Sequence, residues 1–352
     1  MSLLTQKALV HYSKGGDFVV GDVPIPVPGP HEVLVKVMAV ALNPVDWMNQ
    51  AEAYFTPSYP FIAGMDGAGI VEHVGAAVTT LVKGDKILFQ GDFNNDHGTF
   101  QQFCLVPAEI AAKIPEGITF EQAATIPLGL GTAFCGLWNH DPAAKSIDFP
   151  APWEEGGAKF KGKPALILGG ASSVGQYAIQ LAKLAGFSPI VTSASPRNAK
   201  MLRAIGATHV FDRALSNDDA LAMIRTATAG EAVTFAYDAV SRTETASLAY
   251  DALASDGALL LVLPDVLPAD KRANGDTKKV VSVYGVVHPP ENRKIGVEVF
   301  SRVTGWLETG VLVPNKVELL PGGLSGIPDG LRRMKENKVS GMKLVALPQE
   351  TA

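Results

Sequence analysis

The most constraining feature of this 352-residue sequence is an alternation of strand-like and helix-like segments from Pro164 onward. Short apolar runs are separated by segments whose apolar residues recur at helical spacing. The predicted strands are 165–169, 189–194, 208–212, 234–240, 258–263 and 279–287; the predicted helices are 174–185, one ending at Ile205, 217–228 and 243–254. This order predicts β-α-β units, and the continuous apolar strands predict a parallel sheet covered on both faces.

The first of these strands enters a turn of small residues that opens a helix. In LILGGASSVG (166–175), Gly170 and Gly175 take the outer positions of a G-x-G-x-x-G spacing, and Ser172 replaces the middle glycine. Small residues let the backbone approach a pyrophosphate, and the helix N-terminus offers unpaired N–H groups. The residues expected to contact the cofactor here are Gly170, Ala171, Ser172, Ser173 and Val174. The pattern predicts a Rossmann dinucleotide-binding sheet; the alternative is a tight turn without a ligand.

The end of the second strand distinguishes between the two nicotinamide cofactors. An NAD site usually has Asp or Glu there, about 20 residues after the glycines. This sequence has no acid at that point, but it has the hydroxyls of Ser193 and Ser195 and the guanidinium of Arg197. Such groups suit a 2′-phosphate, so we predict NADPH rather than NADH. Arg213, after the third strand, is a second candidate near the adenosine; the alternative for both arginines is a solvated surface position.

The remainder of the chain shows a different pattern of predicted secondary structure. Residues 1–127 read as β-rich, with strand-like runs at 33–42, 68–75 and 85–90 and few helical patterns. The segment 140–163 is rich in Pro, Gly and charged residues, and we expect an exposed excursion there. After 289 come a predicted helix (291–309), a strand (316–320), a short helix (326–337) and a strand (343–347). This tail is expected to complete the first domain.

Composition excludes several classes of protein. The net charge of −5 argues against nucleic-acid binding, which needs clustered Lys and Arg. No apolar run approaches 18 residues, so no membrane span is expected. The two cysteines, Cys104 and Cys135, cannot form a four-cysteine zinc site, and we expect both to be reduced in a cytoplasmic protein.

Six segments together resemble the medium-chain dehydrogenase/reductases, in the quinone oxidoreductase branch and closest to fungal trans-acting enoyl reductases of polyketide synthesis. They are ALNPVDW (41–47), AGMDGAGIVEHVG (63–75), KGDKI (83–87), ATIPLGLGTA (124–133), LILGGASSVGQYAIQLAKLAG (166–186) and RAIGATHVFD (203–212). The resemblance covers nearly the whole chain. It implies an α/β fold with a GroES-like β-rich catalytic domain (1–128, completed by 289–352) and a Rossmann NADPH-binding domain (129–288).

The resemblance also implies that the protein works without zinc. In zinc-using members a Cys lies three residues before the Asp of the first segment, and a Gly-His-Glu opens the second. Asn43 stands at the Cys position and Met65 at the His position, and neither is a good zinc ligand. The seven histidines show no ligand-pair spacing, and His97 and His140 are expected to be surface or loop residues.

Other site residues follow from the resemblance alone. Tyr54 and Asn43 are the residues that it assigns to catalysis. Tyr54, eleven residues after Asn43, would hydrogen-bond the substrate carbonyl or donate a proton; the alternative is an aromatic residue at the rim of the cleft. Many fungal relatives have a Lys where this chain has Met48. The resemblance places Pro44 and Thr132 near the nicotinamide or its ribose, with Leu263, and places Ser340 and Lys343 over the cofactor. It assigns Trp47, Met48, Leu128, Gly129 and Val286 to the substrate pocket. For the apolar residues, core packing is the alternative.

The predicted function is NADPH-dependent hydride transfer to the C=C of an enone or enoyl thioester, or to a quinone. The alternatives are a non-catalytic NADPH-binding relative of the sensor or crystallin type, and a zinc-independent carbonyl reductase. The expected partners are a small unsaturated carbonyl or quinone, with a carrier-bound acyl chain as one form of substrate. The oligomeric state stays open between a monomer and a homodimer formed through strand 279–287.

Overall fold

The computed structural model describes residues 4–272 and 277–352, which form two compact units. The first unit extends to Leu128 and includes Gly296–Gly310 and Pro314–Ala352. The second comprises Gly129–Ile295 and Val311–Val313. Each unit is described by itself below.

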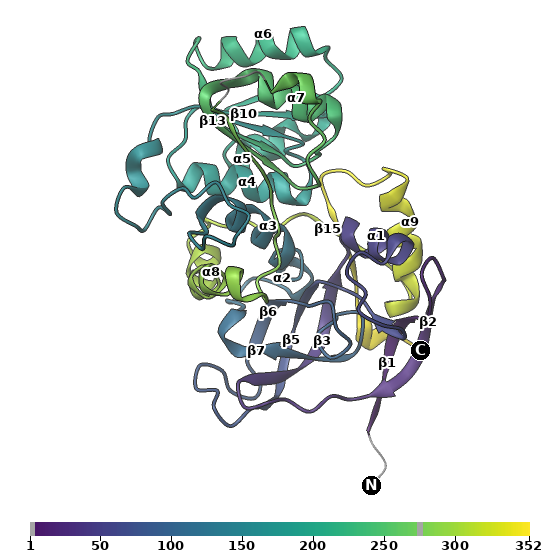
Figure 1. The fold of residues 1–352 in the computed structure, drawn as a ribbon. Helices are drawn as coiled ribbons and strands as arrows, with labels where there is room; N and C mark the ends of the chain where they lie inside the picture. The colour runs from purple at the N-terminus through teal and green to yellow at the C-terminus, as the bar shows by residue number, and fades with distance from the viewer. Residues whose placement is uncertain (1–3, 273–276) are drawn as a thin grey trace. The chain divides into compact units, whose positions relative to one another are not determined.

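The elements follow one another along the chain as drawn in Figure 1. The strands are β1 (Thr5–His11), β2 (Phe18–Pro24), β3 (Glu32–Ala41), β4 (Phe61–Ile62), β5 (Asp66–Val74), β6 (Lys86–Gln90), β7 (Phe103–Pro107), β8 (Ala111–Lys113), β9 (Ala165–Leu168), β10 (Ile190–Ala194), β11 (His209–Asp212), β12 (Val233–Asp238), β13 (Leu253–Leu261), β14 (Lys279–Ser282), β15 (Val317–Leu319) and β16 (Lys343–Ala346). The helices are α1 (Pro44–Glu52), α2 (Phe120–Ala123), α3 (Pro127–Trp138), α4 (Ser173–Leu184), α5 (Ala199–Ile205), α6 (Asn217–Ala227), α7 (Thr243–Ala252), α8 (Pro290–Glu308) and α9 (Ile327–Lys335).

The second unit is built on a six-stranded sheet in the order β11-β10-β9-β12-β13-β14. Every neighbouring pair in this sheet is parallel. Helices α4 and α5 cover one face, and α6 and α7 cover the other (Figure 1). Because both faces are covered, the central strand β9 is buried along its whole length. The predicted doubly wound parallel sheet is confirmed.

The first unit contains two further sheets. The larger follows the order β15-β16-β3-β5-β6-β8, with β7 also paired to β3. The smaller has the order β2-β1-β4. Strand β3 contributes Val33, Val35 and Val37 to the hydrophobic core of this unit, and all three are fully buried. The tail strands β15 and β16 extend the larger sheet, so the C-terminal segment completes the β-rich unit.

Helix α1 was missed by the sequence analysis, which expected few helices before residue 128. It begins inside the segment ALNPVDW, with Pro44 at its first turn and Asn43 as its N-cap. The Asp46 carboxylate accepts a hydrogen bond from the Asn43 backbone N–H at 2.7 Å. Proline at the first position and an acid at the third are helix-start signals, and a nine-residue helix is too short to show clear periodicity.

The expectation of an exposed excursion over 140–163 was wrong for its apolar residues. Ile147, Ala151 and Phe160 are buried. The Phe160 ring stacks on Phe187 at 4.9 Å between centroids and lies 4.3 Å from the ring of Phe149. Composition alone misled here, because the aromatic residues among the prolines and glycines pack against the second unit's own core.

The strand predicted over 279–287 is shorter than expected and ends at Ser282. Beyond it, the side-chain amide of Asn292 donates to the carbonyls of Tyr284 and Val286, both at 2.8 Å. An asparagine thus provides the hydrogen bonds that a neighbouring strand would have made. The strand predicted over 258–263 is longer than expected, since β13 starts at Leu253.

Two expectations about the whole chain concern membranes and cysteines. No helix in the described ranges combines the length and apolar character that a membrane crossing requires. Cys104 and Cys135 are both free and buried, and burial raises the pKa of each thiol. The expectation that both cysteines are unpaired is confirmed.

Candidate functional site

The turn between β9 and α4 is held by hydrogen bonds from both of its sides. Ser172 is the N-cap of α4, and its hydroxyl accepts from the Gly175 N–H at 3.0 Å. The Ser193 hydroxyl, on β10, accepts from the Gly169 N–H at 3.0 Å. A serine at the middle position of the glycine pattern is therefore used as a helix cap, which keeps the turn closed without a third glycine.

At two positions of this turn, neighbouring atoms lie so close to the backbone that only glycine fits. A Cβ on Gly170 would stand 2.1 Å from Thr192 Oγ1, and a Cβ on Gly175 would stand 2.3 Å from the Gly169 carbonyl oxygen. Both positions need glycine because strand, turn and helix approach one another closely. The half-buried residues 171–174 line the start of α4. Together with Gly170 and Gly175 they form what we call the glycine cradle, a turn at a helix N-terminus of the kind that can receive a pyrophosphate.

The predicted adenosine-end residues lie at the carboxyl ends of β10 and β11. These strands are parallel neighbours with Ala194 opposite Asp212, and the Arg213 N–H donates to the Ala194 carbonyl at 3.1 Å. Arg197 and Arg213 are exposed and Ser195 is half-buried. Ser193 is buried, and its hydroxyl holds the turn. The structure brings these four residues to one sheet edge, with the two guanidinium groups reaching solvent.

The start of helix α3 lies close to the start of α4. A Cβ on Gly129 would stand 2.7 Å from Ser173 Oγ and 2.9 Å from the ring of Tyr177. One turn further along, the Thr132 carbonyl accepts from the Tyr237 hydroxyl at 2.9 Å. Gly129 and Thr132 therefore belong to the same compact unit as the phosphate turn.

A buried polar network lies in the first unit around Asp66. Its Oδ1 accepts from the Leu128 N–H at 2.6 Å, and its Oδ2 accepts from Asn43 Nδ2 at 2.8 Å and from Lys343 Nζ at 2.8 Å. Lys343 Nζ also donates to Asn43 Oδ1 at 2.6 Å. Asn43 and Lys343 are each 4% exposed, Asp46 is 2% and Asp66 is 0%. The ammonium group of Lys343 thus contacts Asn43, the residue for which the resemblance implied the Cys position of zinc-using members.

The network contains a second acid, Asp46, whose protonation differs from that of an exposed carboxyl. The pKa of Asp46 is raised to about 7, chiefly by burial and also by the nearby charge of Asp66. The Asn43 backbone N–H and the charge of Lys343 act in the opposite direction. The proton of Asp46 is consequently held or released near neutral pH.

Tyr54 and its neighbours follow the end of α1. Tyr54 is 68% exposed. It follows Ala53, which takes the left-handed conformation at the C-cap of the helix. The next residue, Phe55, stacks on Phe93 at 4.6 Å. The Tyr54 hydroxyl is therefore carried by a segment that a ring stack anchors.

The other residues assigned to substrate or cofactor lie in several places. Trp47 and Met48 are half-buried on α1, with Lys335 Nζ 5.8 Å from the Trp47 ring centroid. Leu263 follows β13, and Val286 is 4% exposed and follows β14. Ser340 is half-buried in the loop before β16, and Pro44 is exposed at the start of α1.

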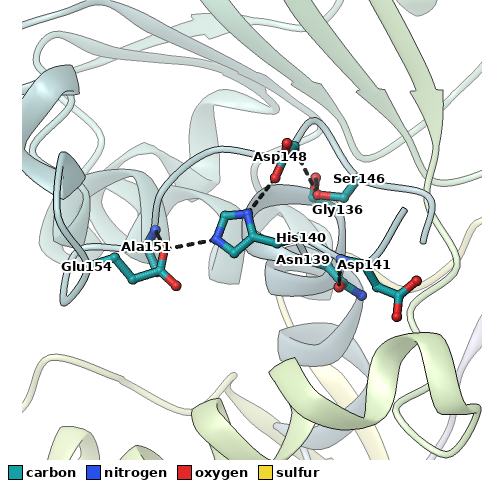
Figure 2. Close-up of polar contacts among 8 residues, drawn as sticks. All are labelled: Gly136, Asn139, His140, Asp141, Ser146, Asp148, Ala151 and Glu154. Carbon is teal, nitrogen blue, oxygen red and sulfur yellow. Dashed lines mark hydrogen bonds and ion pairs between the residues drawn. The ribbon is translucent and has the colours of Figure 1, made fainter. Parts of the chain in front are cut away.

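His140 joins two carboxylates in the segment after α3, as Figure 2 shows. Its Nδ1 meets Asp148, its Nε2 lies 2.9 Å from Glu154 Oε2, and that carboxylate also accepts from the Ala151 N–H at 2.7 Å. The hydrogen bonds with Asp148 and then Glu154 raise the pKa of His140. The contacts of His140 with Asp148 and Glu154 therefore stabilise the fold fully below the ordinary histidine pKa. This stabilisation is lost as the pH rises through the raised pKa of His140.

His97 makes a comparable structural contact in the first unit. Its Nε2 lies 2.7 Å from Glu32 Oε1, and its Nδ1 lies 2.7 Å from Asn94 Oδ1. Within residues 4–272 and 277–352, no three or more His, Cys, Asp or Glu side chains are grouped so that they could hold a metal ion.

Asp66 is the residue of this site that sequence reasoning missed. It lies inside the segment AGMDGAGIVEHVG (63–75), but no role was predicted for it. The available signal was an acid at the head of an apolar, glycine-rich strand, AGMDGAGIVE, with the buried residues Ala68 and Val71 following it. A carboxylate in such a strand is buried and needs partners. Those partners come from distant parts of the chain, so the sequence could not name them.

Comparison with known proteins identifies relatives of both units. The profile of the "Alcohol dehydrogenase GroES-like domain" family matches residues 29–116, and that of the "Zinc-binding dehydrogenase" family matches residues 173–287. A trans-enoyl reductase from a Penicillium species is 32% identical, covering 97% of each chain. A zinc-type alcohol dehydrogenase-like protein from Schizosaccharomyces pombe is 31% identical, covering 96% of this chain and 99% of its own.

Solved structures show the same fold at lower identity. A putative zinc-dependent alcohol dehydrogenase from Rhizobium etli has a TM-score of 0.82 at 24% identity, covering 98% of both chains. A mycobacterial protein solved with NADPH has a TM-score of 0.76 at 22% identity, covering 97% of this chain and all of its own. These structures therefore share the fold of this chain over 97–98% of its length.

Proposed function

This chain belongs to the medium-chain dehydrogenase/reductase family that includes the fungal trans-enoyl reductases, and we propose that it is an NADPH-dependent reductase of activated C=C bonds. The substrate is an α,β-unsaturated carbonyl, as an enone or an enoyl thioester, or a quinone. The observation that carries this proposal is 32% identity to a trans-enoyl reductase along 97% of both chains.

The glycine cradle between β9 and α4 supports a dinucleotide cofactor. Gly170 and Gly175 sit where any Cβ would strike neighbouring atoms, and the N-terminus of α4 offers N–H groups and a positive dipole end. Residues 129–288 are proposed as the NADPH-binding domain, and residues 1–128 with 289–352 as the catalytic domain. Ser195, Arg197 and Arg213 are proposed to hold the 2′-phosphate, because exposed guanidinium groups at the ends of β10 and β11 can bind it by charge-assisted hydrogen bonds.

When bound, NADPH supplies the hydride that adds to the β-carbon of the substrate. The chain's own residues then have to stabilise the developing enolate oxygen and deliver a proton. We assign this hydrogen bond or proton to the Tyr54 hydroxyl, which is 68% exposed and free to approach a substrate. Five residues are proposed to orient the substrate: Trp47, Met48, Leu128, Gly129 and Val286.

The two unpaired cysteines support a cytoplasmic location, where thiols stay reduced.

The cofactor preference can be tested at Arg197. Arg197→Ala should raise the KM for NADPH about 10- to 100-fold and leave the KM for NADH unchanged, because a charge-assisted hydrogen bond contributes about 1.5–3 kcal/mol. Initial rates at 340 nm with each cofactor measure this. Arg203→Ala, at an exposed arginine on α5, is the matched control. Equal losses with both cofactors would assign Arg197 no role at the 2′-phosphate.

The reaction itself is tested with a panel of acceptors: an enone, an enoyl thioester, a quinone and a simple ketone, each with and without chelator. We expect chelator-insensitive oxidation of NADPH with the enone, the thioester or the quinone. Tyr54→Phe should lower kcat at least about 10-fold, because general acid catalysis contributes about 10²–10⁴-fold. Turnover of the ketone alone would identify a carbonyl reductase, and NADPH binding without any turnover would identify a sensor; either result rejects the proposal.

A further inference from the structure

The Asp66 carboxylate connects four segments that lie far apart in the sequence. It heads β5, and it accepts hydrogen bonds from the start of α3 (Leu128 N–H), from the N-cap of α1 (Asn43 Nδ2) and from β16 (Lys343 Nζ). A direct hydrogen bond between Lys343 Nζ and Asn43 Oδ1 closes the ring. One carboxylate thus holds the backbone at the beginning of one helix and the side chain of the residue that precedes another.

Burial makes this arrangement an inefficient way to gain stability. The lysine, the asparagine and the aspartate are all at most 4% exposed. Apolar residues of similar volume often stabilise a core as well as or better than a buried ion pair, because removing charges from water is costly. A buried ion pair can instead hold its neighbours in one defined arrangement. Here those neighbours are the first residues of α3 and the residue that precedes α1.

The two helix starts carry residues of the proposed site. Pro44 and Trp47 lie on the first turns of α1, and Leu128 and Gly129 lie on the first turn of α3. We propose that Lys343 is a positioning residue: through Asp66 and Asn43, its ammonium group holds these two helix starts in the arrangement that hydride transfer requires. This inference rests on the proposed function, and it assigns Lys343 to the first unit's internal network.

Removing the ammonium group would disturb both partners. In Lys343→Met, Asp66 loses the ammonium group that lies 2.8 Å from its Oδ2, and Asn43 Oδ1 loses the donor at 2.6 Å. The Asp66 carboxylate then lies beside the second acid, Asp46, without a balancing cation, and it draws water into the network. Its hydrogen bond from the Leu128 N–H is therefore expected to weaken.

The experiment compares Lys343→Met and Lys343→Arg with Lys113→Met in the full-length protein. Lys113 is the matched control because it ends a strand of the same unit and pairs with Asp85 at 2.9 Å, but its side chain is 48% exposed. Two quantities are measured at a temperature where melting curves show each variant folded. They are kcat and KM with the best acceptor of the panel, and hydrogen exchange of the Leu128 amide.

We expect Lys343→Met to lower kcat at least 10-fold with less than a 3-fold change in the KM for NADPH. The Leu128 amide should exchange at least 10-fold faster, and Lys343→Arg, which keeps the charge, should recover part of both losses. Lys113→Met should match the wild type. Wild-type kcat and wild-type Leu128 exchange in folded Lys343→Met would overturn the inference. A wild-type enzyme without turnover would reject the proposed function, while the Leu128 amide would still report whether Lys343 holds the start of α3.

Discussion

Gly175→Ala should weaken NADPH binding at least about 10-fold and lower the free energy of unfolding. The new Cβ would stand 2.3 Å from the Gly169 carbonyl oxygen and 2.8 Å from Gly170 Cα. Both atoms belong to the backbone, so the turn or the start of α4 must move. Overpacking of this kind costs about 1–3 kcal/mol, and a loss of 1.4 kcal/mol in binding is about tenfold in Kd.

Titration of NADPH by fluorescence and thermal melting of the free protein measure the two effects separately. Gly305→Ala is the matched control, since Gly305 lies in α8 with no atom within 4 Å of an added Cβ. That control should be neutral or stabilise the fold by about 0.5–1 kcal/mol through better helix propensity. If Gly175→Ala bound NADPH like the wild type, the turn could not be the pyrophosphate site.

Asp46→Asn should flatten the dependence of stability on pH between about 4 and about 7. The pKa of Asp46 is raised from 3.8 to about 7, chiefly by burial. The folded state therefore binds this proton more tightly than the unfolded chain. The stability that it contributes is complete below the unfolded pKa and is lost as the pH rises through about 7. The loss amounts to at most about 4 kcal/mol, at 1.36 kcal/mol for each pKa unit.

Asparagine keeps the shape of the side chain and an oxygen that can accept from the Asn43 N–H, but it never has to ionise. The variant should therefore be more stable than the wild type above pH 7, as measured by urea unfolding across the pH range. Asp85→Asn should behave in the opposite sense. Although burial acts to raise it, hydrogen bonds from Lys113 and the Val82 N–H hold the pKa of Asp85 below its ordinary value. Parallel pH curves for wild type and Asp46→Asn would show that folding leaves the pKa of Asp46 unchanged, which would contradict the prediction.

The parallel sheet was predictable from sequence because its information is local. Strands β9, β10 and β12 are short, mostly apolar runs, β11 contributes Val210 and Phe211, and the helices between them show helical spacing of apolar residues. The phosphate turn is equally local, since strand, small residues and helix start follow one another directly. Two predictions were wrong because tertiary contacts outweigh the local pattern. The strand after Ser282 ends early, where the Asn292 side chain donates to the backbone carbonyls, and the predicted exposed segment packs Phe149 against Phe160.

By itself, the sequence determined the alternation of strands and helices from β9 to α7, the small-residue turn, and the presence of Asn43 and Met65 at the positions compared with zinc ligands. Only the tertiary structure decided what surrounds Asn43. Its partner Lys343 lies 300 residues away, and Asp66 joins them through side chains that no spacing relates. The physical reason is that a buried charge has to be satisfied by whichever donors the fold brings within hydrogen-bond distance. That proximity is a property of strands β5 and β16 in the folded sheet and of no single segment of the chain.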